Sequence, residues 1–202
     1  MVDLEERRSI RVYDPTVRIS REEMREILRK ATRAPSSMNM QPWRFVVVES
    51  EQGKKKLKEA ISNNDTQLET SAAMILIMTD LRKYDYAKKI YDMAYEAEAM
   101  PKDVRDRQIR SIANMVPTLS PELIEKSGLI DCGLVAMQLM HVAREHGYDT
   151  CPIGGFDHER ILPVLGLDDR RYRPVLIVSI GKRAEDGYPS LRLPVDDVTT
   201  WL

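Results

Sequence analysis

The chain of 202 residues lacks the charge imbalance and the apolar runs that would place it on nucleic acid or in a membrane. Its 31 Lys and Arg nearly cancel its 32 Asp and Glu, so it has no general basic character for binding nucleic acid or an anionic bilayer. Its longest apolar stretches, 72–79 and 128–143, are too short or are interrupted by Asp131 and Gln138, whereas a spanning helix needs roughly 20 apolar residues. We therefore expect no membrane segment and no nucleic-acid partner.

Cysteine is also scarce. Cys132 and Cys151 belong to no CxxC or Cys/His cluster, which argues against a disulfide framework and a structural zinc site. The N-terminus lacks the positive region, apolar stretch and cleavage site of a signal peptide. These absences predict a cytoplasmic protein without a bound metal.

The chain shows no internal repeat and no linker, and its length suits one domain over residues 1–202. Its patterns predict the following elements: helices over 21–33, 51–61 and from Ser120 to Gly147, two exposed helices between Tyr84 and Met115, a short helix that Asp157 caps, and strands over 45–48, 72–78 and 175–180. The order is not a regular βα alternation, and no GxGxxG or Walker sequence follows a strand. We expect an α+β fold with neither a Rossmann unit nor a P-loop.

Three polar segments stand at the edges of these elements. Arg7, Arg8, Ser9 and Arg11 gather three guanidinium groups and a hydroxyl, a set that can neutralise a phosphate or be a solvated charged surface. The loop over 34–43 carries two hydroxyls and two carboxamides, which suit a planar heterocycle or ordinary turns. The segment over 152–157 contains Gly154-Gly155, where a backbone can approach a flat ligand or simply turn.

Taken in order, four segments of this chain resemble the nitroreductase family of FMN-dependent oxidoreductases. RRSIRVYD at 7–14 is similar to the family's N-terminal element, and APSSMNMQPWRF at 34–45 is similar to its most specific signature. PIGGFD at 152–157 is similar to its late glycine segment, and 181–182 with 191–194 to its basic C-terminal element. The resemblance implies a central, mostly antiparallel sheet flanked by helices and a homodimer with FMN at the interface. It also implies a domain-swapped C-terminal arm.

The resemblance assigns roles by position. It places on the FMN phosphate Arg7, Ser9 and Arg192, with Arg8 or Lys182 as further cations. It places on the pyrimidine side Arg11, Asn64 and Gln67, and on the ring Pro152, Ile153, Gly154 and Gly155. From the loop of the partner chain it takes Pro35, Ser36, Ser37 and Asn39, with Gln41 as a further cofactor contact. Some relatives carry an acidic residue where Gly154 stands and a lysine where Ser190 stands.

The function that follows is transfer of hydride from NADH or NADPH, through FMN, to a nitroaromatic, quinone or flavin acceptor in two alternating half-reactions. Because the flavin performs the hydride step, no catalytic side chain is expected, and the three histidines have no ligand or triad spacing. Arg11 and the backbone of Gly154 and Gly155 would tune the cofactor. The alternatives are a dehalogenase-like or flavin-consuming enzyme of the same fold, or a flavin-binding protein without turnover.

Two further segments carry open expectations. The variable helical excursion within 80–120 is either a substrate cover or a surface hairpin. The apolar arm over 188–202 packs on a partner chain or on its own.

Overall fold

A four-stranded antiparallel sheet organises the chain. The computed structural model describes residues 4–202, and the strands are β1 (Trp43–Val48), β2 (Ala73–Asp80), β3 (Asp149–Ile153) and β4 (Tyr172–Gly181). Their order across the sheet is β1-β2-β4-β3. β2 pairs with β1 from Trp43↔Thr79 to Val48↔Met74, and it pairs with β4 on its other side. The expected α+β fold with a mainly antiparallel sheet is confirmed.

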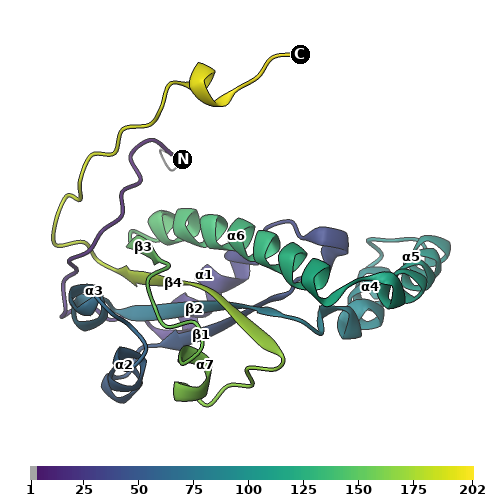
Figure 1. Ribbon diagram of the computed structural model, residues 1–202, viewed down its shortest axis with the longest axis horizontal. Coiled ribbons are helices and arrows are strands. Elements are labelled where there is room, and N and C mark those ends of the chain that lie inside the picture. The colour runs from purple at the N-terminus through teal and green to yellow at the C-terminus, as the bar shows by residue number, and fades with distance from the viewer. Residues whose placement is uncertain (1–3) are drawn as a thin grey trace.

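Helices cover both faces of this sheet (Figure 1). The long α6 (Pro121–Glu145) and α1 (Arg21–Ala31) cover one face, while the other face carries α2 (Glu51–Lys58), α3 (Asp65–Thr70) and α7 (Ile161–Val164). Alternate side chains of β2 enter the two cores, Ile75 and Ile77 toward α6 and Leu76 and Met78 toward α2 and α7. A strand covered on both faces reads as a continuous apolar run, which is why the sequence revealed β2.

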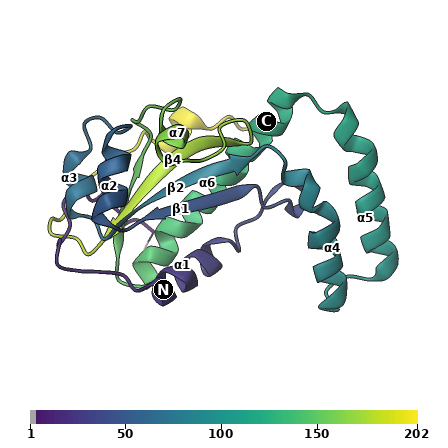
Figure 2. The same cartoon turned by 90° about the horizontal axis from the view of Figure 1, so that it is seen from below.

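The excursion is a pair of helices, α4 (Ala87–Glu96) and α5 (Lys102–Met115). They project from the end of the sheet, as Figure 2 shows. A small separate core of Met40, Ala87, Tyr91 and Ile112 joins them to the loop before β1.

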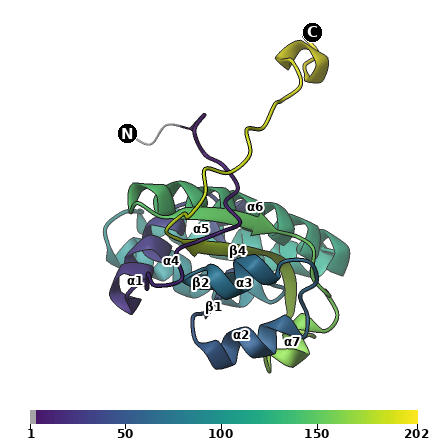
Figure 3. The same cartoon turned by 90° about the vertical axis from the view of Figure 1, so that its left-hand side faces the viewer.

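The C-terminal segment leaves the end of β4 and runs over and away from the α6 side of the body (Figures 1 and 3). It holds one short turn of helix, Val195–Val198, and exposes six large apolar side chains between Tyr188 and Trp201. None of the helices within residues 4–202 is long and apolar enough to cross a membrane.

Three expected helix ends are confirmed, but the expected cap by Asp157 is wrong: α7 begins after Arg160 without a side-chain cap, because Asp157 Oδ1 accepts from Glu159 N and Arg160 N in the turn before the helix. Ser20 Oγ accepts a hydrogen bond from Glu23 N and begins α1, Ser120 does the same for α6 through Leu123 N, and Gly147 follows α6 with a φ of 77°. The helix expected over 51–61 ends earlier, at Lys58. The chain turns because Ile61 forms a β-bridge with Phe156.

One strand and one α-helix were missed. The edge strand β3 contains Pro152, which cannot donate to a ladder and therefore hides a strand from a sequence pattern. The helix α3 has six residues, of which only Gln67 and Leu68 are buried, so it lacks a readable apolar stripe.

Candidate functional site

The N-terminal segment pairs with β3 through backbone contacts. Ser9 forms a parallel bridge with Thr150, and Ile10 N donates to Thr150 O at 3.1 Å. Tyr13 follows as a buried anchor, 1% exposed, with its hydroxyl 2.8 Å from Ser179 Oγ. The arginines that precede this anchor are therefore held at a fixed place beside the sheet.

Four predicted site residues converge on one thiol next to this segment. Burial raises the pKa of Cys151, and four side chains act against that rise: Arg11, Ser9, Gln67 and Arg7. Residues from the N-terminus and from α3 thus approach the same point of β3.

The two predicted carboxamides join this group to the glycine pair. Asn64 Nδ2 donates to Gly155 O at 3.3 Å, and Gln67 Nε2 donates to Asn64 Oδ1 at 3.2 Å. The bridge between Ile61 and Phe156 fixes the same two loops to each other. A ligand lying on the glycine pair would meet both carboxamides at its edge.

The glycine pair itself leaves room for a flat molecule. Gly154 and Gly155 are exposed, and no heavy atom lies within 4 Å of where a Gly154 Cβ would stand. The neighbouring Pro152 is exposed, whereas Ile153 is 4% exposed and packs in the core toward α7. Ile153 can therefore offer a ligand only its backbone.

These residues fit FMN. Arg7 Nη1 is buried and has no hydrogen-bond partner, and a buried guanidinium donor of that kind calls for an anion such as a phosphate. Next to it lie an open glycine surface for a ring and two carboxamides for an edge that both donates and accepts. Within residues 4–202, no group of three or more His, Cys, Asp or Glu side chains is arranged to hold a metal.

The other predicted loop residues form a second group. Ser36, Ser37, Asn39 and Gln41 lie on a tight turn around a 3₁₀ helix, Ser37–Asn39. This turn packs against α4 and α6. It precedes Pro42, whose carbonyl accepts from Asp80 N at the end of β2, whereas Tyr13 and Thr70 meet at the start of β2. At about 3.3 Å per residue β2 is roughly 23 Å long. The turn and the N-terminal group of predicted residues therefore lie at opposite ends of this strand.

The remaining predicted cations lie elsewhere. Arg8 and Lys182 line a separate depression of about 560 Å³, where Lys182 Nζ donates to Gly147 O at 2.8 Å. Arg192 is exposed on the C-terminal segment and donates to Leu191 O. Pro35 is exposed at the start of the turn.

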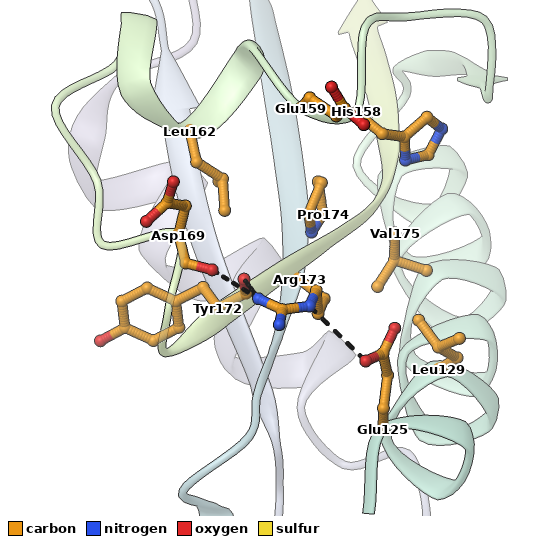
Figure 4. Close-up of a pocket in the computed structure, with 10 residues that line it drawn as sticks. All are labelled: Glu125, Leu129, His158, Glu159, Leu162, Asp169, Tyr172, Arg173, Pro174 and Val175. Carbon is orange, nitrogen blue, oxygen red and sulfur yellow. Dashed lines mark hydrogen bonds and ion pairs between the residues drawn. The ribbon is translucent and has the colours of Figure 1, made fainter. Parts of the chain in front are cut away.

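A hollow of about 780 Å³ is lined by none of the predicted residues. Figure 4 shows it between α6, the 158–162 segment and the start of β4, with Arg173 paired to Glu125 at 3.5 Å. Its walls include Leu129, Leu162 and Val175. This hollow of mixed polarity adjoins α6 rather than the glycine pair.

Sequence reasoning missed two residues that contact the 36–41 turn. Asp131 accepts from Ser37 N, and Tyr91 donates to Met38 O. Asp131 left a signal, because it places a carboxylate within a helix that is apolar nearly all round, whereas Tyr91 left none.

The fold and this split arrangement define an α+β protein with the elements of a site for a planar, anionic cofactor. Residues 4–182 match the family model described as "Nitroreductase family", and the chain belongs to the nitroreductase family.

Close relatives agree with that assignment. A Bacillus subtilis protein named "Putative NAD(P)H nitroreductase YdgI" is 52% identical over 195 residues, which cover 96% of this chain and 93% of the relative. A Lactiplantibacillus plantarum protein named "CLA biosynthesis enone reductase" is 34% identical over 197 residues, or 97% and 91% of the two chains. A solved structure in complex with FMN, from Exiguobacterium sibiricum, is 50% identical with a TM-score of 0.97 and covers 98% of this chain and 95% of its own.

Proposed function

We propose that this protein is an FMN-dependent oxidoreductase that takes hydride from NADH or NADPH and delivers it to a small organic acceptor. The observation that carries the proposal is the convergence at β3 of Arg7, whose buried Nη1 has no hydrogen-bond partner, with two carboxamides and an open glycine pair. The NAD(P)H in one relative's name and the FMN in one relative's crystal support it.

Each residue of this group has a role in holding the cofactor. Arg7 and Ser9 would hold the phosphate, together with Arg192 of the C-terminal segment, and Asn64 with Gln67 would pair with the pyrimidine edge. When bound, FMN supplies the hydride chemistry in two alternating half-reactions. Arg11 would place a positive charge where negative charge gathers on reduction, which makes hydride uptake easier.

The second group of residues is proposed to come from another copy of the chain. Because Ser36, Ser37, Asn39 and Gln41 approach the opposite end of β2 from Tyr13 and Thr70, they are placed to complete the site of a partner. A homodimer with two FMN molecules, each contacted by both chains, uses both groups.

The acceptor is a nitroaromatic, a quinone or a free flavin. The relative named as an enone reductase adds an α,β-unsaturated carbonyl compound to the set worth testing. The α4–α5 pair next to the turn is the segment we expect to influence this choice.

The test has two stages. Purified protein is titrated with FMN and followed by absorbance, and an absence of any ligand-induced change would reject the cofactor. The loaded protein is then mixed anaerobically with NADH or NADPH in a stopped-flow instrument. Rapid bleaching followed by recolouring with an acceptor supports the oxidoreductase, whereas a persistent yellow colour indicates a flavin-binding protein without turnover.

A further inference from the structure

The turn over Ser36–Gln41 has a backbone that its own residues disfavour. Met38, Asn39 and Gln41 have φ angles of 53°, 56° and 47°, in the left-handed region that Met and Gln rarely adopt and Asn tolerates better. Three such residues within four positions persist only where the surroundings hold them. The contacts of the turn should therefore show what fixes it.

One restraint comes from α6. Asp131 Oδ1 accepts a hydrogen bond from Ser37 N at 2.9 Å, across 94 positions of sequence. Asp131 is 3% exposed, and its Oδ2 is buried without a hydrogen-bond partner. Burial raises the pKa of Asp131, and the Ser37 N–H and the charge of Lys83 act against that rise. A carboxylate held there at a cost to its own solvation is poorly explained by core packing.

A second restraint comes from α4. Tyr91, 6% exposed, donates its hydroxyl hydrogen bond to Met38 O at 3.0 Å, at the first of the three left-handed residues. Met40 is 1% exposed and packs in the same small core as Tyr91. The helical excursion therefore holds the middle of the turn, while α6 holds its start.

We infer that Asp131 and Tyr91 are positioning residues. They hold the Ser36–Gln41 turn in the backbone conformation in which it contacts the FMN of a second copy of the chain. The inference rests on the proposed function. Neither side chain needs to touch the cofactor, since each acts through a backbone atom of the turn. It also gives the excursion a role at the flavin site that is separate from covering the substrate.

The variants that test this remove one restraint each. Tyr91→Phe deletes only the hydroxyl, and its matched control is Tyr95→Phe on the same helix, where the ring is 42% exposed. Asp131→Ala deletes the acceptor, and Asp131→Asn is the conservative variant, because its carboxamide oxygen can still accept from Ser37 N. Glu125→Gln is the control on α6, because Glu125 pairs with Arg173 at 3.5 Å and not with the turn.

Two measurements are made on the full-length chain. Hydrogen–deuterium exchange of the peptide that covers 36–41, recorded without cofactor, should become faster in Tyr91→Phe and Asp131→Ala and stay at the parent rate in both controls. The FMN dissociation constant should rise roughly two- to tenfold in the same two variants, as expected for one lost hydrogen bond. Asp131→Asn should recover part of both effects.

Parent-like exchange and parent-like FMN affinity in Tyr91→Phe and Asp131→Ala would overturn the inference. A lower melting temperature with unchanged FMN affinity would also overturn it, since it would show a purely structural role. If the parent itself fails to bind FMN, the proposed function fails. The exchange rates would still decide whether Asp131 and Tyr91 hold the turn.

Discussion

Arg7 and Arg8 are neighbours in the sequence whose side chains belong to different surfaces. Arg7 has a buried Nη1 without a partner, whereas Arg8 donates to Glu5 O and Arg7 O and lines the depression that contains Lys182. Alternation along an extended segment sends consecutive side chains to opposite sides. The phosphate end of the proposed site should therefore depend on the first arginine and not on the second.

We predict that Arg7→Ala raises the FMN dissociation constant roughly tenfold to a hundredfold, because a charge-assisted hydrogen bond contributes about 1.5–3 kcal/mol. Arg8→Ala, which removes the same charge from the chain, should bind FMN nearly as the parent does. Fluorescence titration at one fixed salt concentration compares the two. Equal losses of affinity would show that general charge and not the site geometry holds the phosphate.

Arg11 should act on the cofactor's energetics and not on its retention. It is exposed beside Ser9, whose carbonyl accepts from Arg11 Nη1 at 3.3 Å. Arg11→Ala is expected to lower the midpoint potential of bound FMN and slow hydride uptake at saturating FMN, because a positive charge near the ring favours the reduced form. Arg192→Ala should instead weaken retention. Potentiometric titration of both variants measures the midpoint potential, and fluorescence titration measures FMN affinity. A parent-like potential in Arg11→Ala would refute the role of Arg11.

Asp80 is a buried charge of the sheet with three bonded partners. It is fully buried at the end of β2 and meets Arg44 at 2.9 Å, Arg171 at 2.8 Å and Arg82 N at 3.0 Å. Burial alone would raise the pKa of Asp80, but the bonds from Arg171 and Arg82 N and the charges of Arg44 and Arg171 outweigh it and hold the pKa below the ordinary 3.8. The carboxylate therefore ties β1 and β2 to Arg171, the residue directly before β4, at the base of the excursion.

We predict that Asp80→Asn destabilises the fold by about 1.5–3 kcal/mol at pH 7, since the hydrogen bonds from Arg44 and Arg171 lose their charged acceptor while both guanidinium groups stay partly in water. A depressed folded-state pKa contributes stability that is complete above the unfolded pKa and is lost as pH falls through the folded one. The difference between parent and variant should thus be constant down to about pH 4 and shrink below the ordinary value of 3.8. Urea unfolding at pH 7 and pH 3 measures it, and a gap that does not narrow would contradict the assignment.

At the scale of elements, the contact between α6 and β2 is close enough to require a glycine. A Cβ on Gly128 would lie 2.1 Å from Thr79 Oγ1, and Thr79 is fully buried in β2. The glycine is needed here for the approach of a helix to a strand.

Gly128→Ala should destabilise the protein by roughly 1–3 kcal/mol through overpacking. Thr79→Ala removes the atom that the new methyl group meets, so the double variant should recover much of that loss. Urea unfolding of the four proteins in this double-mutant cycle gives the coupling. Additive losses would mean that α6 and β2 do not meet at these two residues.

The elements that the sequence predicted are those marked by neighbouring residues in the chain. Ser20, Ser120 and Gly147 mark helix ends within a few residues, and the buried run of β2 stands out by composition. β3 depends on its pairing with β4, where Ile153 meets Ile177, and such a pairing leaves no mark within five residues that include a proline.

The candidate site was likewise predictable only in part from the sequence. The resemblance supplied its residue types, yet the separation of Arg8 and Lys182 from Arg7 follows from how the N-terminal segment lies against β3. The bonds from Asp131 and Tyr91 to the turn span 94 and 53 positions, and no local pattern encodes them.

At the scale of the whole molecule, two apolar surfaces lie on the same side. α6 exposes Leu123, Ile130, Leu134 and Met137, and the arm over 188–202 exposes Leu191, Leu193 and Trp201, which is 81% exposed. Figure 3 shows the arm extending beyond α6 and away from the body. A stable monomer rarely leaves surfaces of this kind uncovered, so we propose that a second copy covers both, with arms exchanged.

Truncation after Gly187 tests the exchanged arm. The shortened chain should be a monomer or an aggregate that has lost FMN, because it lacks both the apolar arm and Arg192. The control is full-length Arg192→Ala, which keeps every apolar residue of the arm and should remain a dimer with weaker FMN binding. Multi-angle light scattering with the flavin absorbance recorded on the same peak distinguishes the two. A truncated chain that elutes as a flavin-loaded dimer would show that the α6 face alone joins the copies and that the arm packs elsewhere.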